Sequence, residues 1–375
     1  MAKRGENIYL RKDGRYEGRC MKGRRRNGSI MYHSVYARSL SECKKKLMQA
    51  KLMYYHDRGE CKIYGTGTVK EFMLYWLNEI VKHGVKSSTY ANYVYYNSKW
   101  ITPYLGEKKL YQLKGEEVQQ FVNELVGKGL SAGSVKNIYR VLMSVMKKAK
   151  QYGYIHHHPC EAIMLPEYKH QGVKVLSQGD QQKLEQTSKE SGIMGTIVML
   201  ALYTGLRIGE ICALTVGDID FTKGELTVSK TRQRIRYVEA VAHGAKTGVM
   251  TGSAKSDSSK RLIPLPPFLL VLLKDQVKAS EGASIFTYQG HALEPRVVQY
   301  RFKRLLKRAG IGAVNFHVLR HTFVTRCLEQ NIDVKTISEL VGHSSAKITL
   351  DLYGHSRLEQ KQLAMNHLQR FHLSF

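Results

Sequence analysis

Acidic residues are scarce in this sequence, and long apolar runs are absent from it. The 375 residues include 31 Asp or Glu against 59 Lys or Arg, which gives a formal net charge of +28 at pH 7. A surplus of this size attracts polyanions, so nucleic acid is the expected partner. A membrane surface is the alternative, but the most apolar stretch, residues 193–202, is far shorter than the roughly 20 residues that span a bilayer. We therefore expect a buried core helix there and no membrane partner.

The cysteines are scattered, with no Cys-x-x-Cys pair and no zinc-ribbon spacing. We therefore expect free thiols in a reducing compartment. The N-terminal residues contain no apolar signal region, which favours a cytoplasmic protein. The adjacent histidines at 156–158 have no second ligand cluster, so we predict no metal site there. The six cysteines are Cys20, Cys43, Cys61, Cys160, Cys212 and Cys327.

The first 60 residues are predicted to form a small basic module. Runs that alternate polar with apolar or aromatic side chains over residues 6–38 indicate three antiparallel strands, and Asp13-Gly14 supplies a hairpin turn. A capping box at residues 39–42 should begin a helix that reaches about Tyr55. The module holds 16 Lys or Arg but only 6 Asp or Glu, which suggests a DNA clamp; a solvated basic tail is the alternative. The side chains expected to contact DNA are Arg11, Lys12, Arg15, Arg19, Arg24, Arg25 and Arg26.

A helical bundle is predicted to follow a linker at residues 59–67. From residue 68 to about 154 the hydrophobic pattern fits four amphipathic helices, which is enough to close a bundle. Basic side chains interleaved with its tyrosines and serines suit phosphate contacts that position DNA without reading its sequence. We expect Lys86, Lys136 and Arg140 to make such contacts.

The remainder of the chain is predicted to mix helices with a short sheet. A Ser N-cap at Ser177 begins one helix, and residues 194–203 form the apolar one. Residues 218–230, 232–241 and 261–264 have the pattern of strands, and a loop rich in Gly, Ser and Lys occupies 243–260. From Pro266 onwards the chain is again helical, so the fold class is mainly α with a mixed α+β last domain.

The region 314–355 carries a concentrated set of phosphate-handling side chains. His317 and Arg320 are three residues apart and share one face of a predicted helix, which places a basic nitrogen beside a bidentate fork. His343 follows in a Val-Gly-His-Ser turn, and Tyr353 comes ten residues later as a candidate nucleophile.

These residues resemble the catalytic signature of the tyrosine recombinases, the site-specific DNA integrases of phages and conjugative transposons. The matching segments are His-Val-Leu-Arg-His-Thr, Val-Gly-His-Ser-Ser and Thr-Leu-Asp-Leu-Tyr-Gly-His. Residues 204–210, Thr-Gly-Leu-Arg-Ile-Gly-Glu, match the segment that holds the first catalytic arginine of the family, which is Arg207 here. In isolation, Arg207 is as readily explained by an ion pair with Glu210.

The resemblance implies a role for each of these residues. Tyr353 would attack phosphorus and leave a 3′-phosphotyrosine with a free 5′-hydroxyl, without a metal or any other cofactor. Arg207 and Arg320 would stabilise the charge that develops on the phosphate. His317 would accept the tyrosine proton, and His343 would donate a hydrogen bond to the phosphate.

Lys255 is expected to protonate the departing 5′-oxygen. It aligns with the lysine of the family pattern Lys-Thr-x-Ser-Ser-x-Arg-x-Ile-Pro, although Ser256 replaces the threonine, and Lys246 and Lys260 compete with it in the same loop. His321, one helical turn beyond the first histidine, raises the question of zinc. The His-Glu-x-x-His order is missing and the intervening arginine would repel a cation, so we expect His321 to pack behind the site.

The resemblance also implies a three-domain architecture and an assembly. The ranges are 1–60 for an arm-type DNA-binding domain, 66–160 for a core-binding helical domain, and 172–375 for a catalytic domain with a tail helix. A homotetramer in the bacterial nucleoid would act on core and arm sites of double-stranded DNA through a Holliday junction. An excision helper or DNA-bending protein is a further candidate partner. Separately from the resemblance, the tail at 358–375 has apolar positions that fit a helix, and we hypothesise that it docks on a neighbouring protomer. A type IB topoisomerase-like enzyme and a noncatalytic DNA-binding regulator are the alternatives.

Overall fold

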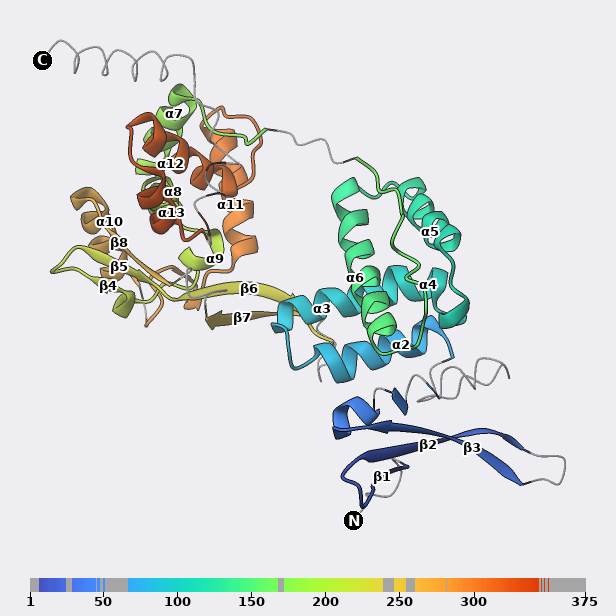
Figure 1. Cartoon of the computed structure of the whole chain (residues 1–375). Coiled ribbons are helices and arrows are strands. Elements are labelled where there is room, and N and C mark those ends of the chain that lie inside the picture. Colours follow the sequence, from blue (N-terminus) through green and yellow to red (C-terminus); the bar gives the residue numbers. More distant parts are fainter. Residues whose placement is uncertain are drawn as a thin grey trace, which may run out of the picture. The chain divides into compact units, whose positions relative to one another are not determined.

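The computed structural model describes residues 7–24, 29–44, 46–47, 50, 67–167, 172–238, 246–253, 260–280, 282–343, 345, 347 and 350. The chain divides into two compact units, Met1–Lys169 and His170–Phe375 (Figure 1). Within the described residues, the helices are all too short or too polar to cross a bilayer.

The N-terminal sheet has the three antiparallel strands that the sequence predicts. They are β1 (Ile8–Leu10), β2 (Tyr16–Arg24) and β3 (Ile30–Ala37), in the order β1-β2-β3. Gly14 occupies the first turn with φ of +76°, a conformation that favours glycine. The Ser39 hydroxyl accepts the Glu42 N–H at 3.2 Å, and a helix begins at Leu40 as expected. The predicted end of that helix, Tyr55, lies outside the described residues.

The predicted four-helix bundle occupies residues 67–167. Its first two helices continue through π-helical turns, and a 3₁₀ turn precedes the third. The elements are α2 (Val69–Tyr75), η1 (Trp76–Val81), α3 (Ser87–Tyr96), η2 (Asn97–Ile101), α4 (Thr102–Leu105), η3 (Leu110–Gln112), α5 (Gly115–Gly127) and α6 (Ala132–Gln151). The apolar faces of these helices bury one continuous core, which includes Phe72, Phe121, Ile138, Leu142 and Met146. This match follows from the strong helical period of the segment.

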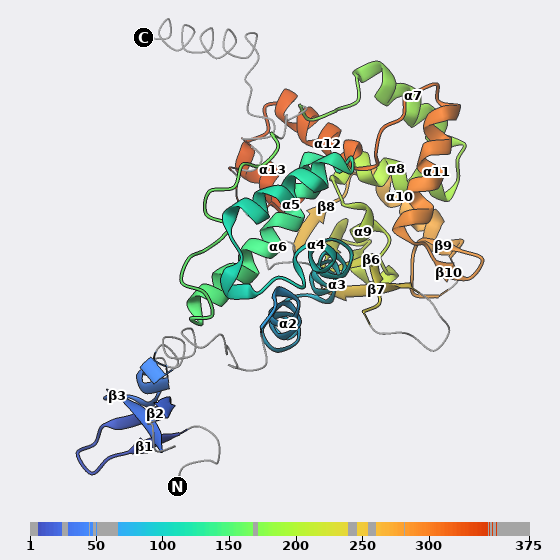
Figure 2. The ribbon, with the colours of Figure 1, turned by 90° about the vertical axis from the view of Figure 1, so that its right-hand side faces the viewer.

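The second unit combines helices with short strands. Its helices are α7 (Gln178–Lys189), α8 (Ile193–Thr204), α9 (Ile208–Ile211), α10 (Pro267–Lys278), α11 (Pro295–Arg308), α12 (His317–Glu329) and α13 (Val334–Val341). Figure 2 shows α8 beside α12 and α11. The strands are β4 (Ile219–Asp220), β5 (Glu225–Val228), β6 (Lys230–Arg236), β7 (Thr247–Ser253), β8 (Arg261–Pro264), β9 (Thr287–Tyr288) and β10 (His291–Ala292).

The sheet differs from the strands that the sequence predicts. Residues 218–230 hold two strands, because the Asp220 carboxylate accepts the N–H groups of Thr222 and Lys223 and closes a turn. The prediction that 243–260 is all loop is wrong, since β7 pairs with β6 from Thr247↔Arg236 to Ser253↔Lys230. The Gly-Thr-Ser composition of β7 resembles a loop, and only its backbone hydrogen bonds to β6 define it as a strand.

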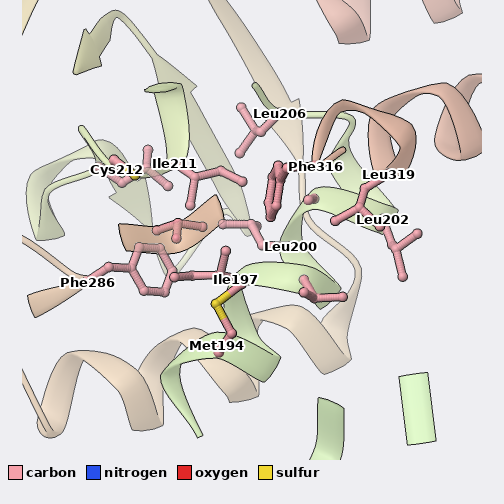
Figure 3. Close-up of a cluster of buried hydrophobic side chains, with 14 of the residues drawn as sticks. Met194, Ile197, Leu200, Leu202, Leu206, Ile211, Cys212, Phe286, Phe316 and Leu319 are labelled. Carbon is pink, nitrogen blue, oxygen red and sulfur yellow. The ribbon is translucent and has the colours of Figure 1, made fainter. Parts of the chain in front are cut away.

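Helix α8 is the centre of the second core. Its residues are apolar on all sides, as the sequence predicts, and α7, α10, α11 and α12 surround it. Figure 3 shows Ile197 and Leu200 of α8 among Phe286, Phe316 and Leu319, which come from distant parts of the chain. This packing fixes the C-terminal end of α8, where the Thr-Gly-Leu-Arg segment begins.

Replacement of Gly195 by alanine should destabilise the second unit. A Cβ at this position would lie 1.8 Å from the Ser188 carbonyl oxygen, so α7 and α8 would have to move apart. We expect the free energy of unfolding of the full chain in urea to fall by about 3 kcal/mol. The matched control is Gly179→Ala in α7, where an added Cβ meets nothing within 4 Å; it should change stability by less than about 1 kcal/mol. Equal effects of the two substitutions would contradict the proposed close approach.

Candidate active site

The structure brings four of the six predicted catalytic residues together at one end of the second unit. Arg207 immediately precedes α9, His317 and Arg320 lie in the first turns of α12, and His343 follows α13. The positive charges of Arg207 and Arg320 lie near enough to lower the pKa of both His317 and His343. Two further predicted residues, Lys255 and Tyr353, lie outside the described residues.

Arg320 is buried, and the backbone at the end of α8 holds it. The residue is 2% exposed, and its Nη1 donates to the Gly205 carbonyl at 2.8 Å. Gly205 has φ of +65°, and an added Cβ would lie 2.6 Å from Cδ1 of Phe323. The glycine of the Thr-Gly-Leu-Arg motif is therefore required both for the turn and for the close approach of α12.

Glu210 is the buried acid of the site, and two arginines share it. Arg207 Nη1 donates to Oε1 at 2.8 Å, and Arg261 donates from Nη1 and Nη2 at 3.2 and 2.9 Å. Burial alone would raise the pKa of Glu210, but Arg261 first and Arg207 second outweigh it and lower that pKa. The ion pair between Arg207 and Glu210 exists, yet the Arg207 side chain remains 37% exposed and open to a ligand.

The same two arginines bind the backbone that carries His343. Arg207 Nη2 donates to the Gly342 carbonyl at 3.2 Å, and Arg261 Nε donates to the Leu340 carbonyl at 2.6 Å. Gly342 ends α13 in the left-handed region at φ of +65°, and the His343 N–H closes the cap on Ser338. The position of His343 therefore depends on a helix cap and on two guanidiniums.

Both predicted catalytic histidines are held in the neutral form. Desolvation by the surrounding protein lowers the pKa of His317 to about 4, and the neighbouring His321, Arg320 and Arg207 lower it further, although the residue is partly exposed to solvent. Desolvation likewise lowers the pKa of His343 to about 4, followed by the charges of Arg320 and Arg207. Near neutral pH the imidazoles can therefore accept a proton or a hydrogen bond.

His321 packs its ring against His317, as residues one helical turn apart do. The two ring centroids are 4.6 Å apart in a T-shaped arrangement. Burial lowers the pKa of His321, and Arg320 lowers it further. The two imidazoles therefore contact each other on the first turns of α12.

Sequence reasoning did not single out Arg261 or the shared role of Glu210. A signal was present, because Arg261 is the arginine of the Lys-Thr-x-Ser-Ser-x-Arg-x-Ile-Pro pattern and Glu210 ends the Arg207 motif. The pairing itself is invisible in sequence, since 51 residues separate the two partners.

Two of the predicted DNA contacts of the N-terminal module pair with a buried carboxylate, that of Glu17. Arg11 Nη1 and Arg19 Nε donate to Glu17 at 3.0 and 2.9 Å. The Arg19 hydrogen bond is the main reason why the pKa of Glu17 is lowered to about 2. Arg15 pairs with Asp13, and Lys12 is exposed. The Arg24 side chain and the whole of Arg25 and Arg26 lie outside the described residues.

Basic side chains also lie exposed on the helices of both units. In the bundle, Lys136 and Arg140 are one turn apart on α6, and Lys86 precedes α3. In the second unit, α11 contains no acidic residue, a feature that sequence reasoning left unused. Its basic residues are Arg296, Arg301, Lys303, Arg304, Lys307 and Arg308.

Protonation of His317 and His343 should make the fold less stable at low pH. Both pKa values are about 4 in the folded chain, below the ordinary value of 6.5. Between these values the unfolded state binds more protons, so the free energy of unfolding should fall as the pH drops from about 6.5 to about 4. Urea unfolding at about pH 7 and about pH 5 gives the free energy of unfolding at each pH. Its decrease between the two should be smaller for the double variant His317→Asn/His343→Asn than for wild type. Equal losses would assign the pH dependence to other groups.

Two family patterns match the chain. The phage integrase family pattern matches residues 174–360, which includes all six predicted catalytic positions. The pattern of the phage integrase N-terminal SAM-like domain matches residues 68–126 of the bundle.

Relatives and solved structures agree with these matches. The chain is 27% identical to the tyrosine recombinase XerC-like protein of Caldanaerobacter subterraneus subsp. tengcongensis, over 92% of this chain and 93% of that protein. The Tn1549 transposon integrase, solved with a circular intermediate DNA, has a TM-score of 0.70 at 20% identity, over 80% of this chain and 99% of that one. The lambda integrase tetramer on a Holliday junction has a TM-score of 0.57 at 21% identity, over 91% and 96%. The signature residues, the fold and the two family patterns together establish that this chain belongs to the phage integrase family of tyrosine recombinases.

Proposed function

We propose that this recombinase integrates and excises a mobile element, cutting and rejoining DNA strands through a 3′-phosphotyrosine intermediate. The observation that carries the proposal is a cationic site in which Arg207 and Arg320 lie near two neutral histidines. The likeness to the Tn1549 transposon integrase supports a mobile element as the substrate's source.

The charges of the site suit a phosphodiester. Phosphoryl transfer places additional negative charge on the nonbridging oxygens, and fixed guanidiniums stabilise it without reorganising. The exposed part of Arg207 is proposed to contact the phosphate, while buried Arg320 adds positive charge to the site. A bound phosphate would offset the positive charges around His317 and His343 and so raise the pKa of each.

Two proton transfers accompany the cleavage. Tyr353 Oη loses its proton to neutral His317 and forms a bond to phosphorus, and the bond from phosphorus to the 5′-oxygen breaks. Lys255 supplies the proton for that oxygen, and His343 donates a hydrogen bond to the phosphate. A second 5′-hydroxyl reverses the step, so the reaction needs no cofactor.

We assign DNA-binding roles to three parts of the chain, 1–60, 66–160 and 172–375. The basic sheet suits arm sites, with Arg11, Arg15 and Arg19 on its surface. The bundle suits the backbone of the core site through exposed lysines and arginines. The basic helix α11 adds a third positively charged surface, on the catalytic domain.

The active assembly is proposed to be a homotetramer on two paired core sites. The lambda integrase tetramer on a Holliday junction supports this arrangement through the shared fold. An excision helper or a DNA-bending protein is a proposed additional partner, and the tail 358–375, outside the described residues, is proposed to dock on a neighbouring protomer. Supercoil relaxation without recombinant products would favour the topoisomerase alternative instead.

Tyr353→Phe should abolish covalent capture of DNA. A nicked suicide duplex from the end of the element, incubated in EDTA and analysed on a denaturing gel, should yield a protein–DNA adduct with wild type and none with the variant. The control Tyr203→Phe keeps its ring and loses only the hydroxyl that donates to Glu185, so it should still form adduct. Tight DNA binding without any adduct from wild type would favour the noncatalytic regulator.

Lys255→Ala should slow cleavage about 100-fold or more, because the 5′-oxygen loses its proton donor. A duplex with sulfur in place of that bridging oxygen should restore a rate near wild type, since a thiolate leaves without a proton. Lys246→Ala and Lys260→Ala, measured in parallel by single-turnover cleavage, test the two competing lysines. If Lys246→Ala or Lys260→Ala is rescued by the sulfur substrate and Lys255→Ala is not, the rescued position holds the lysine that protonates the 5′-oxygen.

A further inference from the structure

Arg261 connects three segments that are far apart in the sequence. It is the first residue of β8, and its side chain is 5% exposed. Nη1 and Nη2 donate to the carboxylate of Glu210 in α9, and Nε donates to the Leu340 carbonyl in the last turn of α13. All three guanidinium nitrogens therefore act on protein acceptors.

We infer that Arg261 is a positioning residue for the cleavage reaction, acting through Arg207 and His343 without contacting the phosphate. The inference rests on the proposed function, because it assumes that these two residues face the reacting phosphate. Burial and the three hydrogen bonds direct the Arg261 guanidinium at Glu210 and the α13 cap.

The first effect of Arg261 is electrostatic. The Glu210 side chain is 4% exposed. Its carboxylate accepts hydrogen bonds from the backbone N–H and from Nη1 of Arg207. With Arg261 present, one carboxylate is shared by two guanidiniums, so positive charge remains available on Arg207. Without Arg261 the buried carboxylate would be compensated by Arg207 alone, which would draw that guanidinium inward and weaken its attraction for phosphate.

The second effect is geometric. Leu340, Gly342 and His343 belong to the C-terminal cap of α13. Arg261 donates to the Leu340 carbonyl, and Arg207 donates to the Gly342 carbonyl. Loss of the Nε hydrogen bond would release one side of this cap and change the distance between His343 and Arg207. A displacement of about 1 Å at such a site costs on the order of 100-fold in rate.

The test compares single-turnover cleavage of the suicide duplex by wild type, Arg261→Met and Arg261→Lys. We expect Arg261→Met to cleave about 100-fold more slowly, with DNA affinity changed less than about threefold. Arg261→Lys should lose less, because it keeps the charge but lacks the planar fork. Added guanidinium should raise the rate of Arg261→Met, and so should Glu210→Gln in the same chain, since each relieves the unbalanced carboxylate.

The matched control is Arg326→Met on α12. Arg326 also donates to a carboxylate, that of Glu329, and to a backbone carbonyl, that of Leu176, but away from the site. Arg326→Met should lower the unfolding temperature and leave the cleavage rate unchanged. If Arg261→Met fails to fold, the guanidinium response of Arg261→Lys provides the same test.

The outcomes separate this inference from the proposed function. If wild type forms no adduct, the proposed function fails. If wild type forms adduct and both Arg261 variants cleave at its rate, the positioning role is wrong. A slow Arg261→Met that responds neither to guanidinium nor to Glu210→Gln would also overturn it, since the residue would then be structural only.

Discussion

The carboxylate of Glu210, buried between the guanidiniums of Arg207 and Arg261, is the contact on which the cluster of predicted catalytic residues depends. It joins the turn after α8 to the start of β8, and through Arg261 it reaches the cap of α13. A buried carboxylate is costly unless it is paired and hydrogen-bonded. Two arginines meet that requirement and still leave the cluster positively charged, which a site for a phosphodiester requires.

Backbone carbonyls orient the arginines without cancelling their charge. Arg320 donates to Gly205, Arg207 to Gly342 and Arg261 to Leu340. A carbonyl accepts a hydrogen bond but carries no net charge, so these bonds help to fix the three guanidiniums without offsetting their positive charge. Desolvation is the main reason why the pKa values of His317 and His343 are lowered, and the charges of these arginines lower them further. The cationic cluster therefore contributes to keeping both histidines neutral.

Much of the fold followed from local patterns. The Asp-Gly turn, the Ser39 cap and the alternating runs predicted the N-terminal sheet and the start of its helix, and the 3.6-residue period predicted the four bundle helices. The strand β7 was missed, because Thr247–Ser253 has loop composition and becomes a strand only by pairing with β6. The turn at Asp220 divided a predicted strand for a similar reason: a side-chain hydrogen bond within the turn outweighed the strand pattern.

The sequence by itself determined which side chains are candidates for chemistry, since the order and spacing of Arg207, His317, Arg320, His343 and Tyr353 form a recognisable signature. Local spacing also placed His317 and Arg320 on one helix face. Only the tertiary structure decided that Arg261 shares Glu210 with Arg207, and that desolvation lowers the pKa of His317 and His343. Desolvation and charge depend on which segments approach one another through space, and residues 51 to 135 apart in the chain make these contacts without any local periodicity.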